Sequence, residues 1–235
     1  MTVIAGVDGC RGGWLCVLRN GNDGLVQATV LERIGDLLTL CPRPDLVLID
    51  MPIGLPDAGP RECDRQARRL LQPPRSSSVF SAPIRPALHA RSYQEACAIG
   101  SRIDGRKLTK QLWGIVPKIR ELDSFLGGKA ARAGWIREFH PEVSFWAWNG
   151  QKAMTHRKKS AAGRAEREAL IQTYAGTGFK AARSQLPRRH CQIDDLLDAF
   201  AGLWSAERVV TGRALVLPVG APVFDSRGLR MEIVV

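Results

Sequence analysis

The hydrophobic pattern of the chain opens with a buried strand. Residues 2–8 are almost wholly apolar and rich in strand-forming side chains, which is typical of a strand buried on both faces of a sheet. A similar run at 45–50 predicts a second buried strand, and both runs end on an aspartate. Residues 14–19 and 25–31 predict two further strands, which form a three-stranded meander with the first. Residues 135–139 predict a fifth strand.

Helical periodicity predicts the connections between these strands. Residues 32–41 place apolar side chains at the spacing of one helical face, and Pro-Arg-Pro at 42–44 ends the segment. A strand reached through a helical crossover normally runs parallel to its neighbour, so the strand at 45–50 should pair with the first. This pairing would bring Asp8 and Asp50 to the same edge of the sheet. The other predicted helices cover residues 61–71, 92–103, 108–126, 160–174 and 193–204.

Two of these helices have faces of distinct character. The helix at 108–126 has an apolar stripe, which we interpret as core, and Pro117 should kink this helix or mark its start. The helix at 160–174 is expected to place Arg164 and Arg167 on its solvated side.

The last helix opens with three aspartates, which is more than capping needs. Asp195 and Asp198 are three residues apart and face the same way. We expect Asp194 to be the residue that caps the helix, because free amides and the helix dipole favour an acid there. Beyond this helix, residues 214–217 and 231–235 predict a C-terminal hairpin.

Composition indicates a soluble globular protein. The chain has 235 residues, of which 45% are hydrophobic and 24% charged, enough for a substantial core. No apolar run approaches the ~20 residues that span a bilayer, and the N-terminus lacks a signal-peptide pattern. We therefore expect a cytoplasmic protein without a membrane partner. The six cysteines form no Cys-x-x-Cys pair, so a disulfide framework or structural zinc site is not predicted.

The charge of +11 is concentrated in the middle of the chain. Residues 102–189 hold 19 Arg and Lys against 7 Asp and Glu, whereas both ends are mildly acidic. This pattern favours an acidic core with a basic appendage that attracts a polyanion, and nucleic acid is the obvious candidate. The alternative is a solvated face that only keeps the protein soluble.

Asp8 is the first candidate site residue. A carboxylate at the end of a buried strand is costly unless a cation, a donor or a turn compensates it. The alternative is that Asp8-Gly9 simply closes a hairpin, since this pair is common in tight turns. The strand at 135–139 is expected to give way to a turn at 140–142, where Glu142 could face the edge shared by Asp8 and Asp50. We interpret the neighbouring His140 as structural, because no second histidine stands at metal-ligand spacing.

The order of these elements resembles the ribonuclease H-like fold, in which one acid lies in the first strand, another ends the fourth strand, and one or two stand on the last helix. Asp8, Asp50, Asp195 and Asp198 occupy those places, and the Asp-x-x-Asp-Ala start of the last helix resembles the Holliday-junction resolvase branch.

The successive motifs are also similar to those of the DUF429 family, described as predicted RNase H-like nucleases. These motifs are GVDGCRGGW at 6–14, IDMPIGLP at 49–56, SVF at 78–80, FHPEVSF at 139–145 and DLLDA at 195–199.

The resemblance implies an α/β fold in a single domain covering residues 1–235. It predicts an RNase H-like mixed five-stranded sheet flanked by helices, with a C-terminal hairpin. The core would comprise residues 1–54 and 135–235, and a helical basic insertion would occupy about 55–134.

The resemblance also implies a nuclease that uses Mg²⁺ or Mn²⁺. Two ions about 4 Å apart, held by carboxylates, can activate water and stabilise the leaving oxygen. The expected metal ligands are Asp8, Asp50, Asp195 and Asp198, with Glu142 as an additional or substitute catalytic carboxylate. The expected contacts to DNA or RNA come from Arg11, Arg85, Lys158, Lys159 and Arg164, which would make binding salt dependent.

Two other classes of function remain open. The Asp-Gly-x-x-Gly-Gly turn resembles the phosphate loop of actin-like ATPases and sugar kinases, which need two such domains; a homodimer could supply the second. The protein could also be a small-molecule enzyme, or a nucleic-acid-binding protein that kept the fold without catalysis.

Overall fold

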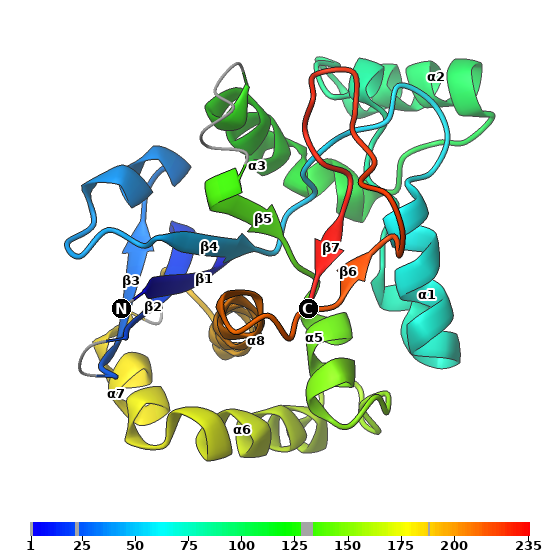
Figure 1. The fold of residues 1–235 in the computed structure, drawn as a ribbon. Helices are drawn as coiled ribbons and strands as arrows, with labels where there is room; N and C mark the ends of the chain where they lie inside the picture. The colour runs from blue at the N-terminus through cyan, green and yellow to red at the C-terminus, as the bar shows by residue number, and fades with distance from the viewer. Residues whose placement is uncertain (1, 22–23, 128–133, 188) are drawn as a thin grey trace.

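The computed structural model describes residues 2–21, 24–127, 134–187 and 189–235, and its centre is a five-stranded mixed sheet (Figure 1). The strand order is β3-β2-β1-β4-β5, in which β1, β2 and β3 are antiparallel while β4 runs parallel to both β1 and β5. The strands are β1 (Val3–Cys10), β2 (Gly13–Asn20), β3 (Val26–Leu31), β4 (Leu46–Ile49) and β5 (Ile136–Glu138). The predicted α/β class, meander and parallel crossover are confirmed.

Helices cover both faces of the sheet (Figure 1). On one face α8 lies against β1, β2 and β4, with α5, α6 and α7 around it. The short 3-10 helix η1 and α3 lie on the other face. These elements are η1 (Ile34–Thr39), α3 (Lys110–Leu126), α5 (Pro141–Trp148), α6 (Ala161–Ala175), α7 (Thr177–Gln185) and α8 (Ile193–Val210).

The predicted helical insertion lies between β4 and β5, although its residues 128–133 are outside the described ranges. Before α3 it consists of α1 (Glu62–Arg75), η2 (Ser76–Ser78), η3 (Arg85–Ala87) and α2 (Tyr93–Asp104). The predicted C-terminal hairpin is also present, as the antiparallel pair β6 (Val216–Leu217) and β7 (Ile233–Val234). None of the described helices is long and apolar enough to cross a membrane.

Three local predictions need correction. Residues 32–41 contain a 3-10 helix rather than an α-helix, and Pro117 lies inside α3 instead of marking its start. The turn expected at 140–142 is the beginning of α5, where Pro141 takes the first helical position that suits its fixed φ. The sequence pattern also missed α7, a short helix with two buried residues, Phe179 and Ala182.

Two hydrophobic cores meet at β1 and explain why its sequence does not alternate. Ala5 and Val7 face the core shared with η1 and α3, whereas Ile4 and Cys10 face the core shared with α8. Side chains on a strand alternate between faces, so Asp8 lies on the α8 side with Ile4 and Cys10.

Gly6 allows α8 to lie directly against β1. A Cβ atom on Gly6 would lie 2.0 Å from the carbonyl oxygen of Ala199, and a Cβ on Gly202 would lie 3.1 Å from the Gly6 Cα. Glycine is therefore required where the helix crosses the strand, and this crossing places the start of α8 beside the carboxyl end of β1.

Gly6→Ala should destabilise the protein because the added methyl group overlaps the backbone of α8. We expect the free energy of unfolding, measured by urea denaturation, to fall by about 2–3 kcal/mol. Gly114→Ala in α3 is the control, because a Cβ there meets nothing within 4 Å. Alanine in that helix should stabilise by up to about 1 kcal/mol. An unchanged stability of the Gly6 variant would contradict the close packing.

Candidate active site

Four aspartates converge at the carboxyl end of β1. Asp8 lies near the end of β1, and Asp50 directly follows β4, whose parallel pairing with β1 sets the two side by side; the Asp50 amide donates to the Val7 carbonyl at 2.9 Å. Asp195 and Asp198 come from the first turns of α8. The structure thus brings together the four carboxylates that the sequence singled out.

The cluster carries more negative charge than its surroundings neutralise. Burial raises the pKa of Asp8 well above its ordinary value, and the charges of Asp50 and Asp198 raise it further. Burial and Asp198 likewise raise the pKa of Asp50. Burial also raises the pKa of Asp198, although Lys158 opposes the shift. Such a site favours the binding of a cation or a proton.

Within the described ranges, Lys158 is the basic residue that forms an ion pair with this cluster. Its ammonium donates to the Asp198 carboxylate. Although burial lowers the pKa of Lys158, attraction to Asp198, Asp8 and Asp50 outweighs that effect and raises it. Among the described residues, the second oxygen of Asp198, Oδ1, is buried without a hydrogen-bond partner. Lys158, predicted to contact nucleic acid, is thus also an internal counterion.

The donor chemistry suits a hard divalent cation, because all four groups are carboxylates. In the ranges that the structure describes, no three or more His, Cys, Asp or Glu side chains are arranged to hold a metal ion. The unsatisfied Asp198 oxygen and the raised pKa values of the aspartates are the features that fit such a ligand. The arrangement seen is therefore one in which an ammonium partly compensates the acids.

Asp194 and Asp195 exchange the roles expected of them. Asp195 accepts a hydrogen bond of 2.8 Å from the Gln192 amide and caps α8. Asp194 instead forms an ion pair of 2.9 Å with Arg164. The prediction that Asp194 is the cap is wrong, because Arg164 on α6 lies within reach of Asp194. Of the three aspartates that open α8, Asp198 is therefore the one that neither caps the helix nor pairs with Arg164.

Glu142 lines the same cavity as Asp8 and Asp50, but an arginine neutralises it. Both of its oxygens accept from Arg167 at 2.7 and 2.9 Å, and the two side chains are almost completely buried. The expectation that Arg167 lies on a solvated face is wrong, because this side chain is 0% exposed. Glu142 is thereby distinguished from Asp8, Asp50 and Asp195, for which the described part of the chain provides no ion pair.

The remaining basic residues divide into two groups. Arg11 and Lys159 line cavities beside the aspartates, and Arg164 stands nearby through its ion pair with Asp194. Arg85 lies in neither cavity; its guanidinium forms ion pairs with Asp123 and Asp225. The structure does not bring Arg85 together with the other predicted substrate contacts.

Two cavities meet at the cluster, where Gly9, Lys158 and Lys159 border both. The smaller, of about 320 Å³, is basic and includes Arg11 and Arg189. The larger, of about 440 Å³, reaches from Asp8 and Asp50 to the insertion and also includes His140 and Glu142.

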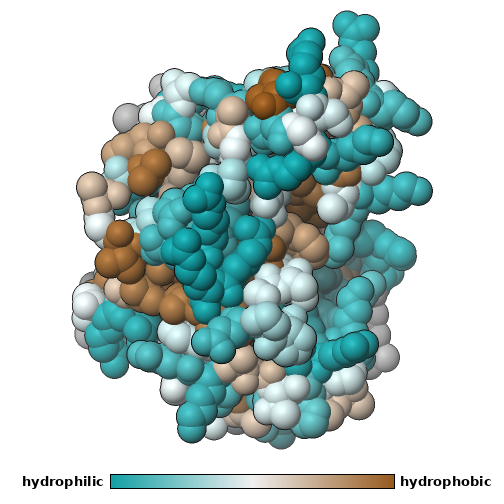
Figure 2. All heavy atoms as spheres, turned by 90° about the vertical axis from the view of Figure 1, so that its right-hand side faces the viewer, coloured by the Kyte–Doolittle hydropathy of each residue, from teal (hydrophilic) through white to brown (hydrophobic). Residues whose placement is uncertain are grey.

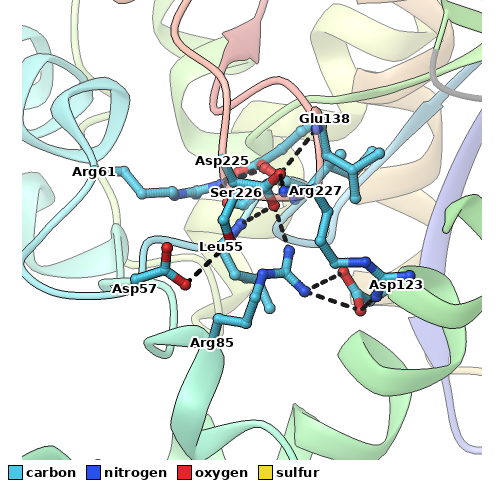
Figure 3. Close-up of polar contacts among 12 residues, drawn as sticks. Leu55, Asp57, Arg61, Arg85, Asp123, Glu138, Asp225, Ser226 and Arg227 are labelled. Atoms are coloured by element: carbon cyan, nitrogen blue, oxygen red, sulfur yellow. Dashed lines mark hydrogen bonds and ion pairs between the residues drawn. The ribbon is translucent and has the colours of Figure 1, made fainter. Parts of the chain in front are cut away.

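A buried ion-pair network holds the loop that follows Asp50 (Figure 3). Arg61 bonds to Asp64 at 2.6 Å and to both oxygens of Glu138 at 2.6 and 2.7 Å. Glu138 also accepts from the Ile53 amide at 2.6 Å. Burial raises the pKa of Glu138 to about 7, against the opposing effect of Arg61. Sequence analysis missed this network, although Glu138, like Asp8 and Asp50, is an acid at the end of a predicted strand.

The second part of this network fastens the C-terminal loop to the insertion. Asp225 accepts from Arg85 and from the Leu55 amide, and Asp123 pairs with both Arg85 and Arg227 (Figure 3). Both parts of the network therefore act on the 51–56 segment, next to Asp50.

A family model described as "Protein of unknown function (DUF429)" matches residues 6–222. The fold and the site define an α/β protein with a buried carboxylate cluster at one sheet edge, and this chain belongs to the DUF429 family. Searches of curated proteins and of solved structures gave no match.

Asp8→Asn should stabilise the metal-free protein near neutral pH. The unfolded aspartate ionises near pH 4. The folded carboxylate holds its proton to higher pH, so the stability that it contributes is lost as pH rises from about 4 through its folded pKa. Urea denaturation in chelator should show that the free energy of unfolding of Asp8→Asn exceeds that of the wild type by about 1 kcal/mol or more at pH 7.5. The gain should shrink toward pH 4.5.

The exposed Asp57 provides the control, because Asp57→Asn removes a carboxylate outside the cluster. This variant should show no such pH-dependent gain. A constant difference between Asp8→Asn and the wild type at both pH values would argue against a strained Asp8 charge.

Arg167→Met should destabilise the protein by about 3–5 kcal/mol, since it leaves the buried Glu142 carboxylate without its partner. The double variant Arg167→Met/Glu142→Leu should recover much of that loss, because both charges are then gone. Thermal and urea denaturation would measure both effects. Additive losses in the double variant would show that the two side chains are not coupled.

Proposed function

We propose that the protein is a divalent-metal-dependent nuclease that hydrolyses phosphodiester bonds on an RNase H-like fold. The observation that carries the proposal is the convergence of Asp8, Asp50, Asp195 and Asp198 at one sheet edge, with raised pKa values for all four. Structural carboxylates nearby, such as Glu142, are each given an arginine. Among the described residues, the cluster has one ion pair, between Asp198 and Lys158, and buried negative charge of this kind is typical of sites that bind cations.

Asp8, Asp50 and Asp198 would hold Mg²⁺ or Mn²⁺, with Asp195 as a further ligand. When bound, the metal supplies a Lewis acid for the phosphate and lowers the pKa of a water molecule. Lys158 holds the Asp198 carboxylate and offers a positive charge beside the site. Glu142 stands at the start of α5. Its ion pair with Arg167 holds this part of the helix next to the cavity.

Basic side chains next to the cluster support nucleic acid as the substrate. Arg11, Lys159 and Arg189 line the smaller cavity beside Asp195. Figure 2 views the side of the molecule toward which β1 and β4 point in Figure 1, and hydrophilic side chains alternate there with hydrophobic patches. Lysine and arginine at such a surface bind phosphates with strong salt dependence.

A cleavage assay tests the proposal directly. Labelled single-stranded, duplex and branched DNA and RNA would be incubated with Mg²⁺, Mn²⁺ or chelator. We expect metal-dependent cleavage that chelator abolishes and that Asp8→Asn reduces by more than about 100-fold, beyond the usual cost of losing an outer-shell group. Asp57→Asn should cleave like the wild type.

The contrary result is equally specific. Absence of cleavage with either metal, together with nucleic-acid binding that Asp8→Asn leaves unchanged, would overturn the nuclease and favour a non-catalytic binding protein.

A further inference from the structure

The larger cavity has walls of two kinds. Asp8 and Asp50 stand on the wall formed by the carboxyl ends of β1 and β4. The insertion forms a second wall, to which Val79 and Phe80 after η2, and Leu112 and Ile115 on α3, contribute apolar side chains beside polar ones such as Gln111. A cavity of about 440 Å³ with an apolar wall and a few polar groups has the size and character of a small-ligand pocket.

Phe80 is unusual among the residues that line this cavity. Its side chain is 42% exposed, although aromatic side chains are normally covered. An exposed ring on a cavity that also contains lysines is an arrangement on which nucleic-acid bases stack, since every base offers a flat π-face.

His140, which lines the same cavity, has an acceptor atom without a partner in the described part of the chain. Its Nε2 lies 3.3 Å from the Ser78 carbonyl, which can only accept, so Nε2 carries the hydrogen. The neutral ring then presents Nδ1 as an acceptor, and this atom is buried without a partner among the described residues. A buried polar atom without a partner is costly, so a ligand that donates to it gains affinity.

We propose that this cavity seats one unpaired nucleoside of the substrate. The base lies against Phe80, and a hydroxyl or amino group of the nucleoside donates to His140 Nδ1. The adjoining phosphates lie along the smaller cavity, near Arg11 and Lys159, and the scissile phosphate would lie at the aspartates only when a divalent ion is bound there. This inference rests on the proposed function and names its substrate class, a single strand or a strand end rather than an intact duplex.

Size and connectivity give the physical reason. A base inside a duplex is paired and stacked, so it cannot enter a cavity of this size without leaving its partner. An intact duplex would leave the cavity empty and gain nothing from Phe80 or His140. The two cavities share Gly9, Lys158 and Lys159, so a strand can pass from one to the other across the carboxylates.

Fluorescence anisotropy in chelator tests the inference without requiring cleavage. The probes are a labelled single-stranded oligonucleotide and the duplex of the same sequence. We expect the single strand to bind at least about 10-fold more tightly, and Phe80→Ala to weaken it about 10-fold while duplex binding stays unchanged. Phe224→Ala is the matched control, because Phe224 is 52% exposed and lies outside the cavity.

A second variant fills the cavity instead of emptying it. Ile115→Trp places a larger side chain on the apolar wall and should weaken single-strand binding as Phe80→Ala does. Equal binding of single strand and duplex, unaffected by either variant, would overturn the inference.

The two proposals fail separately. If cleavage is metal dependent and requires Asp8 while the cavity variants change nothing, the nuclease stands and the nucleoside site is wrong. If no cleavage occurs but single-strand binding depends on Phe80 and Ile115, the nucleoside site stands and the nuclease is wrong.

Discussion

The crossing of α8 over β1 at two glycines is the constraint on which the site depends. Gly6 and Gly202 have no side chains to separate the helix from the strand. Asp8 lies two residues beyond Gly6 on the same face of β1, and Asp198 lies one helical turn before Gly202 on the same face of α8. Close contact at the glycines therefore brings the two acids together, and the parallel pairing of β4 with β1 adds Asp50. A wider helix–sheet spacing would separate these charges.

The acids of this protein are buried in two different ways. Glu138 and Glu142 each have a buried arginine, Arg61 and Arg167, and their ion pairs join elements that are far apart in the sequence. In the described part of the chain, the aspartate cluster has a single ion pair, with the half-buried Lys158, and an excess of negative charge. Burial without matched compensation lowers stability, so its presence at one place in an otherwise compensated structure marks that place as a site rather than as part of the framework.

The insertion changes what the sheet edge can bind. Its residues after η2 and on α3 line a cavity together with the carboxylates at the ends of β1 and β4. The ion pairs of Arg85, Asp123, Asp225 and Arg227 fasten the C-terminal loop to the insertion, and the Leu55 amide joins them to the loop after Asp50. The same network therefore supports both walls of the cavity. It holds the apolar wall in a fixed position relative to the acids.

The sequence by itself determined the elements and the neighbours that follow from short-range patterns. Apolar runs identified the strands, and the crossover rule brought Asp8 beside Asp50. Tertiary structure decided the environment of each polar side chain. The helical pattern placed Arg167 on a solvated face, but its side chain is buried in an ion pair with Glu142 on α5. Asp194 was expected to cap α8, but it pairs with Arg164 on α6. A periodic pattern reports which way a residue faces on its own element, but the charge, burial and partners that it meets come from residues distant in the chain.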